Sequence, residues 1–132
     1  MKNYQTSEIK NVVLLGAPGS GKTTFAEAMA FEGKVIDRRG SIENENTLSD
    51  NTDLEHSNRR SIYSTILYTE FMNHKLNIID APGSDDFSGG LFAAFKVADV
   101  GLMLFNAQNG FEVGSEIQSR YAKTYNVPLV GV

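Results

Sequence analysis

The sequence predicts an α/β domain with a mostly parallel sheet. Short apolar runs alternate along the chain with segments whose apolar residues recur at helical spacing, which is typical of parallel strands joined by helices. One pair of runs is separated only by a short polar turn, which indicates an antiparallel hairpin at one edge of the sheet. The 132 residues contain no internal repeat or low-complexity tract, so we expect residues 1–132 to belong to one domain.

The first expected strand and helix flank a glycine-rich turn. The apolar run 12–15 predicts a buried strand that ends at Gly16. Good helix formers occupy 23–31, and Gly33 is expected to end this helix. Residues 34–60 are polar and lack periodicity, so we expect a long loop that is mobile or is ordered only by a ligand.

The second half of the chain supplies the hairpin and the remaining alternation. We expect strands at 61–68, 76–79, 100–105 and 127–132, helices at 91–97 and 114–125, and a glycine-rich loop at 81–90. Asn73 and His74 mark the hairpin turn. The final run resembles a core strand, and the chain stops inside it.

The composition is that of a soluble globular protein and excludes several classes. Lys and Arg total 12 and Asp and Glu total 16, so the net charge of −4 argues against a general nucleic-acid binder and against DNA as a partner. The lack of cysteine excludes disulfides and thiolate metal sites. No apolar run is long enough for a membrane span, and we expect a cytoplasmic monomer.

The motif at 16–23, Gly-Ala-Pro-Gly-Ser-Gly-Lys-Thr, matches the phosphate-binding pattern G-x-x-x-x-G-K-[ST] of P-loop NTPases. Glycines let successive backbone amides point at phosphate oxygens, and the following helix adds its positive N-terminal end. Lys22 can reach the β- and γ-phosphates, and the Thr23 hydroxyl can bind Mg²⁺. A merely structural turn is the alternative. The expected nucleotide-binding residues are Gly16, Ala17, Pro18, Gly19, Ser20, Gly21, Lys22, Thr23, Thr24 and Asp80.

A second motif, Asp-Ala-Pro-Gly at 80–83, follows the strand expected at 76–79. Asp80 is where the carboxylate that supports Mg²⁺ belongs, and the Gly83 amide would sense the γ-phosphate in a GTPase. Ala81 stands where many P-loop ATPases carry a catalytic Glu, and the pairing of this motif with the phosphate motif favours GTP and GDP over ATP. The alternative is ordinary turn chemistry.

The guanine-reading motif [NT]-K-x-D occurs nowhere in the sequence. In a GTPase domain it would follow a strand such as 127–132, so we expect this chain to be the N-terminal portion of a GTP-binding domain, truncated at its C-terminus. The alternative is a complete protein that does not select guanine.

Three segments, 16–24, 77–87 and 98–116, together resemble the GTP-binding domain of translational GTPases. The pattern is most similar to elongation factor G, in the divergent second form that some bacteria carry. The resemblance implies a doubly wound fold, a ribosomal partner through RNA and proteins, and a role in translocation or recycling. It also implies switch segments at 34–65 and 80–95, which the γ-phosphate orders.

The sequence departs from this family where the chemistry occurs. Ser84 stands at the position of the family's water-positioning His, and Gly19 at that of an Asp which helps to hold a monovalent cation. The switch Thr that binds Mg²⁺ has only weak candidates in Ser61 and Thr65. Because phosphoryl transfer depends on positioning and electrostatics, we expect weak or absent GTP hydrolysis.

Two other functions stay open: a regulatory module that holds GTP without hydrolysis, and a P-loop ATPase or kinase. The remaining notable residues have plain structural interpretations. We expect His56, His74, Asp85, Asp86 and Lys96 in solvent, the arginines 38, 39, 59 and 60 on a solvated loop or against ribosomal RNA, and Phe92, Phe95, Phe105 and Phe111 in packed positions.

Overall fold

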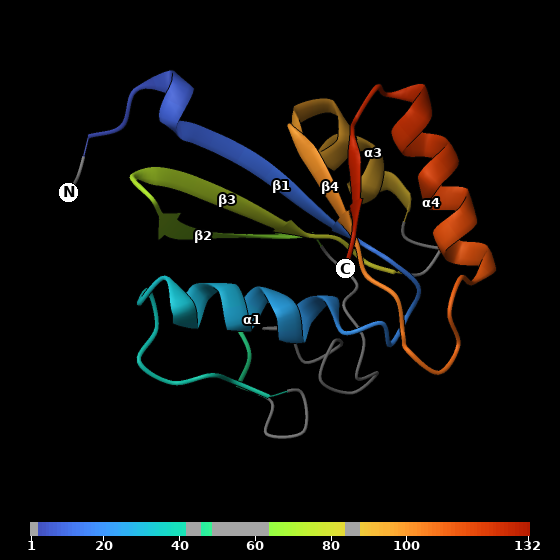
Figure 1. The fold of residues 1–132 in the computed structure, drawn as a ribbon, viewed down its shortest axis with the longest axis horizontal. Helices are drawn as coiled ribbons and strands as arrows, with labels where there is room; N and C mark the ends of the chain where they lie inside the picture. The colour runs from blue at the N-terminus through green and yellow to red at the C-terminus, as the bar shows by residue number, and fades with distance from the viewer. Residues whose placement is uncertain (1–2, 42–45, 49–63, 84–87) are drawn as a thin grey trace.

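The computed structural model describes residues 3–41, 46–48, 64–83 and 88–132, and it has helices on both faces of a five-stranded sheet (Figure 1). The strands are β1 (Ile9–Leu15), β2 (Thr65–Phe71), β3 (His74–Asp80), β4 (Val100–Met103) and β5 (Leu129–Gly131). The helices are a 3-10 turn η1 (Thr6–Glu8), α1 (Lys22–Glu32), α3 (Ser88–Val97) and α4 (Val113–Thr124). No helix in these ranges is long and apolar enough to cross a membrane.

The strand order is β2-β3-β1-β4-β5, and it confirms the predicted fold class. β1 pairs in parallel with β3 and β4, and β4 pairs in parallel with β5. Only the pairing of β2 with β3, within this sheet, is antiparallel. β1 therefore lies at the centre, and its carboxyl end delivers the chain to the phosphate motif between two parallel neighbours, which is where ligands bind in open α/β sheets.

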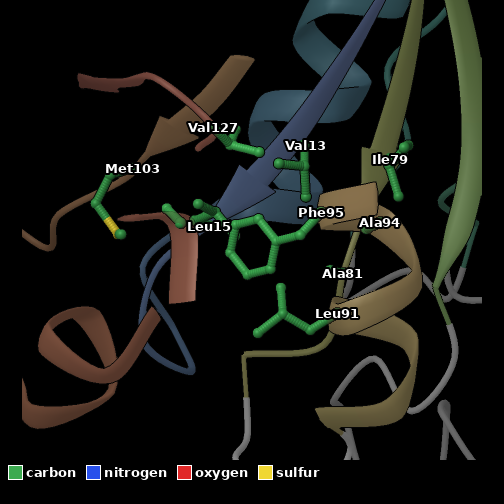
Figure 2. Close-up of a cluster of buried hydrophobic side chains, with 10 residues drawn as sticks. Val13, Leu15, Ile79, Ala81, Leu91, Ala94, Phe95, Met103 and Val127 are labelled. Atoms are coloured by element: carbon green, nitrogen blue, oxygen red, sulfur yellow. The ribbon is translucent and has the colours of Figure 1, made fainter. Parts of the chain in front are cut away.

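Alternate residues of β1 enter two separate cores. Val13 and Leu15 face α3 and α4, where Phe95 is fully buried beneath them (Figure 2). Val12 and Leu14 face α1 on the other side of the sheet. Because both faces are covered there, residues 12–15 of the strand are apolar without interruption, as in most parallel strands.

Several predicted boundaries shift in the structure. β1 begins three residues earlier than expected because its polar start is already paired with β3. The hairpin turn lies at Met72 and Asn73, which adopt left-handed φ angles of 45° and 63°. β4 ends at Met103 rather than at residue 105, and the strand expected from 61 is described only from residue 64 onward.

Two structural expectations are wrong. Gly89 and Gly90 lie in the first turn of α3 rather than in a loop, because the helix starts before its apolar residues do. Phe111 is 61% exposed rather than packed in a core, although its ring contacts that of Phe105. The final run forms β5 at the edge of the described sheet: Val127 before it joins the core, while Leu129 and Val130 are exposed.

Candidate functional site

The phosphate motif forms a tight loop between β1 and α1. Gly16, Gly19 and Gly21 have φ angles of 137°, 78° and 90°, a region that other residues rarely adopt. Gly21 is the residue that precedes α1, so the loop ends at the positive N-terminus of that helix. The predicted context of strand, loop and helix is therefore present. Thr24, also expected to bind the nucleotide, is exposed in the first turn of α1.

Lys22 is buried and its amine points back across the loop. Its Nζ donates hydrogen bonds to the carbonyl oxygens of Gly16 at 2.9 Å and Ala17 at 3.0 Å. Burial lowers the pKa of Lys22, and the nearby charge of Asp80 opposes that shift. The loop thus encloses a desolvated cationic group that an anion would stabilise.

Thr23 and Asp80 form the second part of the site. The Thr23 hydroxyl donates to Oδ2 of Asp80 at 2.9 Å, and both residues are buried. Asp80 ends β3 and lies beside Leu14 of β1 in the parallel register, which brings its carboxylate to the base of the loop. Hydroxyl and carboxylate oxygens are the ligands that Mg²⁺ prefers, so the donor set fits this ion.

Gly83 brings the second motif onto the first. A Cβ built at Gly83 would overlap Nζ of Lys22 and would lie 3.0 Å from the carbonyl oxygen of Gly16. A larger residue at this position would therefore have to displace the Lys22 amine, so close approach favours glycine here. Ser84 follows directly and lies outside the described residues, as do Ser61, His56, Asp85 and Asp86.

The structure adds two polar residues that no motif indicated. Gln118 of α4 is buried and bonds Gly16, the first residue of the loop. Glu27 of α1 is buried one helical turn after Thr23. Its carboxylate accepts hydrogen bonds from the backbone amides of Gly40, at 3.0 Å, and Leu48. A polar residue on the buried face of a helix is the sequence signal that could have identified each of them.

One weak candidate for the switch Thr can be located. Thr65 begins β2 and lies opposite Asp80 in the antiparallel register. The strand that follows the predicted first switch therefore starts beside the carboxylate of the site. Gly19, expected from the sequence to stand at the position of an Asp in the family, is exposed in the loop.

The model of the elongation factor Tu GTP binding domain matches residues 7–132. The chain belongs to this family. It is 36% identical over 104 residues to an elongation factor G-like protein of Mycobacterium tuberculosis, covering 79% of this chain and 15% of that protein. It is 29% identical over 123 residues to the tetracycline resistance protein TetM of Enterococcus faecalis, covering 93% and 19%. The chain thus spans less than a fifth of the length of these relatives.

Solved structures agree on the fold. A protein of Thermus thermophilus superposes with a TM-score of 0.89 at 32% identity, over 95% of this chain and 19% of that one. A bacterial selenocysteine-specific elongation factor, EF-Sec, superposes with a TM-score of 0.72 at 22% identity, over 92% and 19%, which supports the fold alone. The resemblance to translational GTPases is confirmed.

Proposed function

We propose that this protein binds GTP and GDP together with Mg²⁺ at the loop 16–23 and serves as the nucleotide-binding part of an elongation factor G-like factor that acts on the ribosome. One observation carries the proposal: the amine of Lys22, the oxygens of Thr23 and Asp80, and the backbone of Gly83 converge on one glycine-rich loop. Family membership supports guanine as the base.

Each group has a distinct role in this proposal. The amides of the loop bind phosphate oxygens, and Lys22 neutralises the β- and γ-phosphates. Thr23 and Asp80 would hold Mg²⁺, whose charge balances that of the phosphates when it is bound. Gly83 lies against Lys22, so its amide is near the place where a γ-phosphate would be recognised. The loop carries no general base, and positioning is its contribution to the reaction.

Competitive binding tests the nucleotide. In the full protein, a fluorescent GDP analogue should be displaced by GTP and GDP at concentrations at least tenfold below those of ATP, because the family reads guanine. Lys22→Met should abolish binding at the same concentrations, since it removes the buried cation. Preferential displacement by ATP would contradict the proposal in favour of a P-loop ATPase.

We extend the proposal to slow hydrolysis, on the ground that Ser84 replaces the family's His. A serine side chain is shorter than an imidazole and leaves the attacking water without its positioning group. Single-turnover hydrolysis with ribosomes should be slow, and Ser84→His should accelerate it while nucleotide affinity stays constant. Turnover as fast as in an ordinary elongation factor would refute this part. No turnover in either variant, with binding intact, favours a regulatory module.

The ribosomal partner, the cytoplasmic location and the monomeric state belong to the same proposal. The full protein should sediment with ribosomes in the presence of a non-hydrolysable GTP analogue and dissociate with GDP, because γ-phosphate contacts order the switches. Equal sedimentation with both nucleotides would refute a nucleotide-controlled ribosomal role.

A further inference from the structure

We infer that Gln118 is a positioning residue that holds the phosphate loop in its nucleotide-binding shape from the side of α4. This inference rests on the proposed binding of a guanine nucleotide at that loop. Gln118 does not belong to either motif, and it lies 102 residues from its partner Gly16.

The carboxamide of Gln118 meets Gly16 at two points. Its Oε1 accepts a hydrogen bond from the Gly16 amide at 2.7 Å, and its Nε2 donates one to the Gly16 carbonyl oxygen at 3.4 Å. The side chain is nearly inaccessible, with 2% of the residue exposed. A buried carboxamide is costly unless its polar atoms are paired, so this geometry explains why a polar side chain occupies the site.

The same Gly16 carbonyl connects Gln118 to the cation of the site. It accepts Nζ of Lys22 at 2.9 Å, so one peptide group joins α4 to the amine that would meet the phosphates. Gly16 is also confined from a third side, because a Cβ there would overlap the carbonyl oxygen of Leu104. Gln118 therefore fixes the orientation of the peptide on which Lys22 rests.

Gln118 serves the phosphate loop, because α4 does not need a polar residue at this position for its packing. Ser115, Gln118 and Ala122 form the buried face of the helix, and Ala122 already joins the apolar core. A methionine at position 118 would fill a similar volume without any desolvation cost. Unlike methionine, the carboxamide fixes the backbone of the loop. The loop then loses less conformational entropy when a nucleotide binds.

The first test is Gln118→Met in the full protein. We expect GDP affinity to fall about tenfold, because a loop amide loses its partner and the loop becomes less ordered. The ³¹P resonance of the β-phosphate of bound GDP should also shift. The matched control is Thr69→Val, which removes a buried 3.0 Å hydrogen bond to Met29 on the α1 side. It should lower stability similarly while GDP affinity stays within twofold.

The second test uses pH to restore the contact. In Gln118→Glu the ionised carboxyl keeps an acceptor for the Gly16 amide but turns an oxygen toward the Gly16 carbonyl. Once protonated, this carboxyl can donate to the carbonyl as the carboxamide does. Affinity relative to wild type should therefore recover between about pH 8 and about pH 5.5, since burial raises such a pKa, although Lys22 on the same carbonyl opposes that shift. Gln118→Met should show no recovery.

The outcomes separate the two proposals. If the wild-type protein binds no guanine nucleotide, the proposed function fails and the inference fails with it. If the wild type binds but Gln118→Met binds equally well, only the role of Gln118 is refuted. The same holds if Thr69→Val loses as much affinity as Gln118→Met, since the loss then follows from stability alone, or if Gln118→Glu shows no relative recovery at low pH.

Discussion

The phosphate loop and the segment around Gly40 and Leu48 both lie against α1, yet they are held in different ways. The loop is bound by α4 through Gln118, confined by the end of β4, and bridged internally by Lys22. The segment is bound to the helix through the carboxylate of Glu27, which accepts an amide from each side of residues 42–45. The loop has constraints from several elements, whereas the one side chain of Glu27 binds the described residues on both sides of the segment.

This difference matches the roles expected of the two regions. A site that binds phosphates through backbone amides gains affinity when its backbone is already ordered. A segment that changes conformation with the γ-phosphate needs contacts that can be released together. Glu27 lies one helical turn after Thr23, so the anchor of the segment is on the helix that carries the proposed metal ligand. Nucleotide affinity should therefore be sensitive to the loop and insensitive to Glu27.

Gly16→Ala should have the largest effect on affinity. The methyl group would overlap the Leu104 carbonyl at a φ of 137°, so the loop must shift. We expect GDP affinity to fall at least about a hundredfold and unfolding free energy to drop by about 3 kcal/mol, as for strain at a special backbone position. Calorimetry and urea unfolding measure both. Gly110→Ala, at a φ of 66° with open space around its Cβ, is the control and should leave affinity unchanged.

Lys22 should give a pH signature of comparable size. Because burial lowers its pKa in the folded protein, the unfolded chain binds more protons between that lowered pKa and 10.5, and stability should rise with pH there. Bound phosphate favours the ammonium form, so GDP affinity should fall over the same range. Lys22→Met should remove this rise in stability, which urea unfolding at several pH values measures. Identical pH profiles of stability in both proteins would refute the role of Lys22.

Thr23→Val should have a smaller effect that appears only with the metal. The variant loses the hydroxyl that bonds Asp80, so the Mg²⁺ concentration needed for half-maximal nucleotide binding should rise about tenfold. Thr124→Val removes a hydroxyl that bonds the Arg120 carbonyl near the end of α4, and it should not change this concentration. An unchanged Mg²⁺ requirement in Thr23→Val would show that the hydroxyl is only structural.

Glu27→Ala should change GDP affinity least, by less than about twofold. This variant separates the loop from the segment most clearly. Two backbone amides lose a buried acceptor, so we expect unfolding free energy to fall by about 2–4 kcal/mol. Amide exchange at Gly40 and Leu48 should accelerate strongly while that of Gly16 stays slow. If Gly16 exchanged equally fast, the two regions would form one cooperative unit and the comparison would fail.

The sequence predicts this site well where the chemistry is local. Gly16 to Thr23 and Asp80 to Gly83 are contiguous motifs whose residue types follow from phosphate and Mg²⁺ chemistry, and the parallel register of β1 and β3 brings them together. The roles of Ser84 and Gly19 stay predictions. The contacts of Gln118 and Glu27 cannot be predicted from motifs, because both side chains bind backbone groups. Any residue type at the partner position could supply such a group.

The errors in the fold also have physical causes. Gly89 and Gly90 resemble turn residues because their helix propensity is weak, and the apolar helix that follows them outweighs that weakness. Phe111 shows the limit of prediction for a single residue, since its exposure depends on elements distant in sequence.

The hydrogen bonds that Lys22 makes within the loop bear on which anions can bind there. The ammonium group donates hydrogen bonds to the carbonyl oxygens of Gly16 and Ala17. It therefore already has hydrogen-bond acceptors before a ligand binds. An incoming anion must compete with these two oxygens rather than fill an empty site. A single halide offers one weak acceptor and cannot compete, whereas a chain of phosphates supplies several oxygens and engages the loop amides as well. We therefore expect the loop to prefer polyphosphates to small anions such as halides.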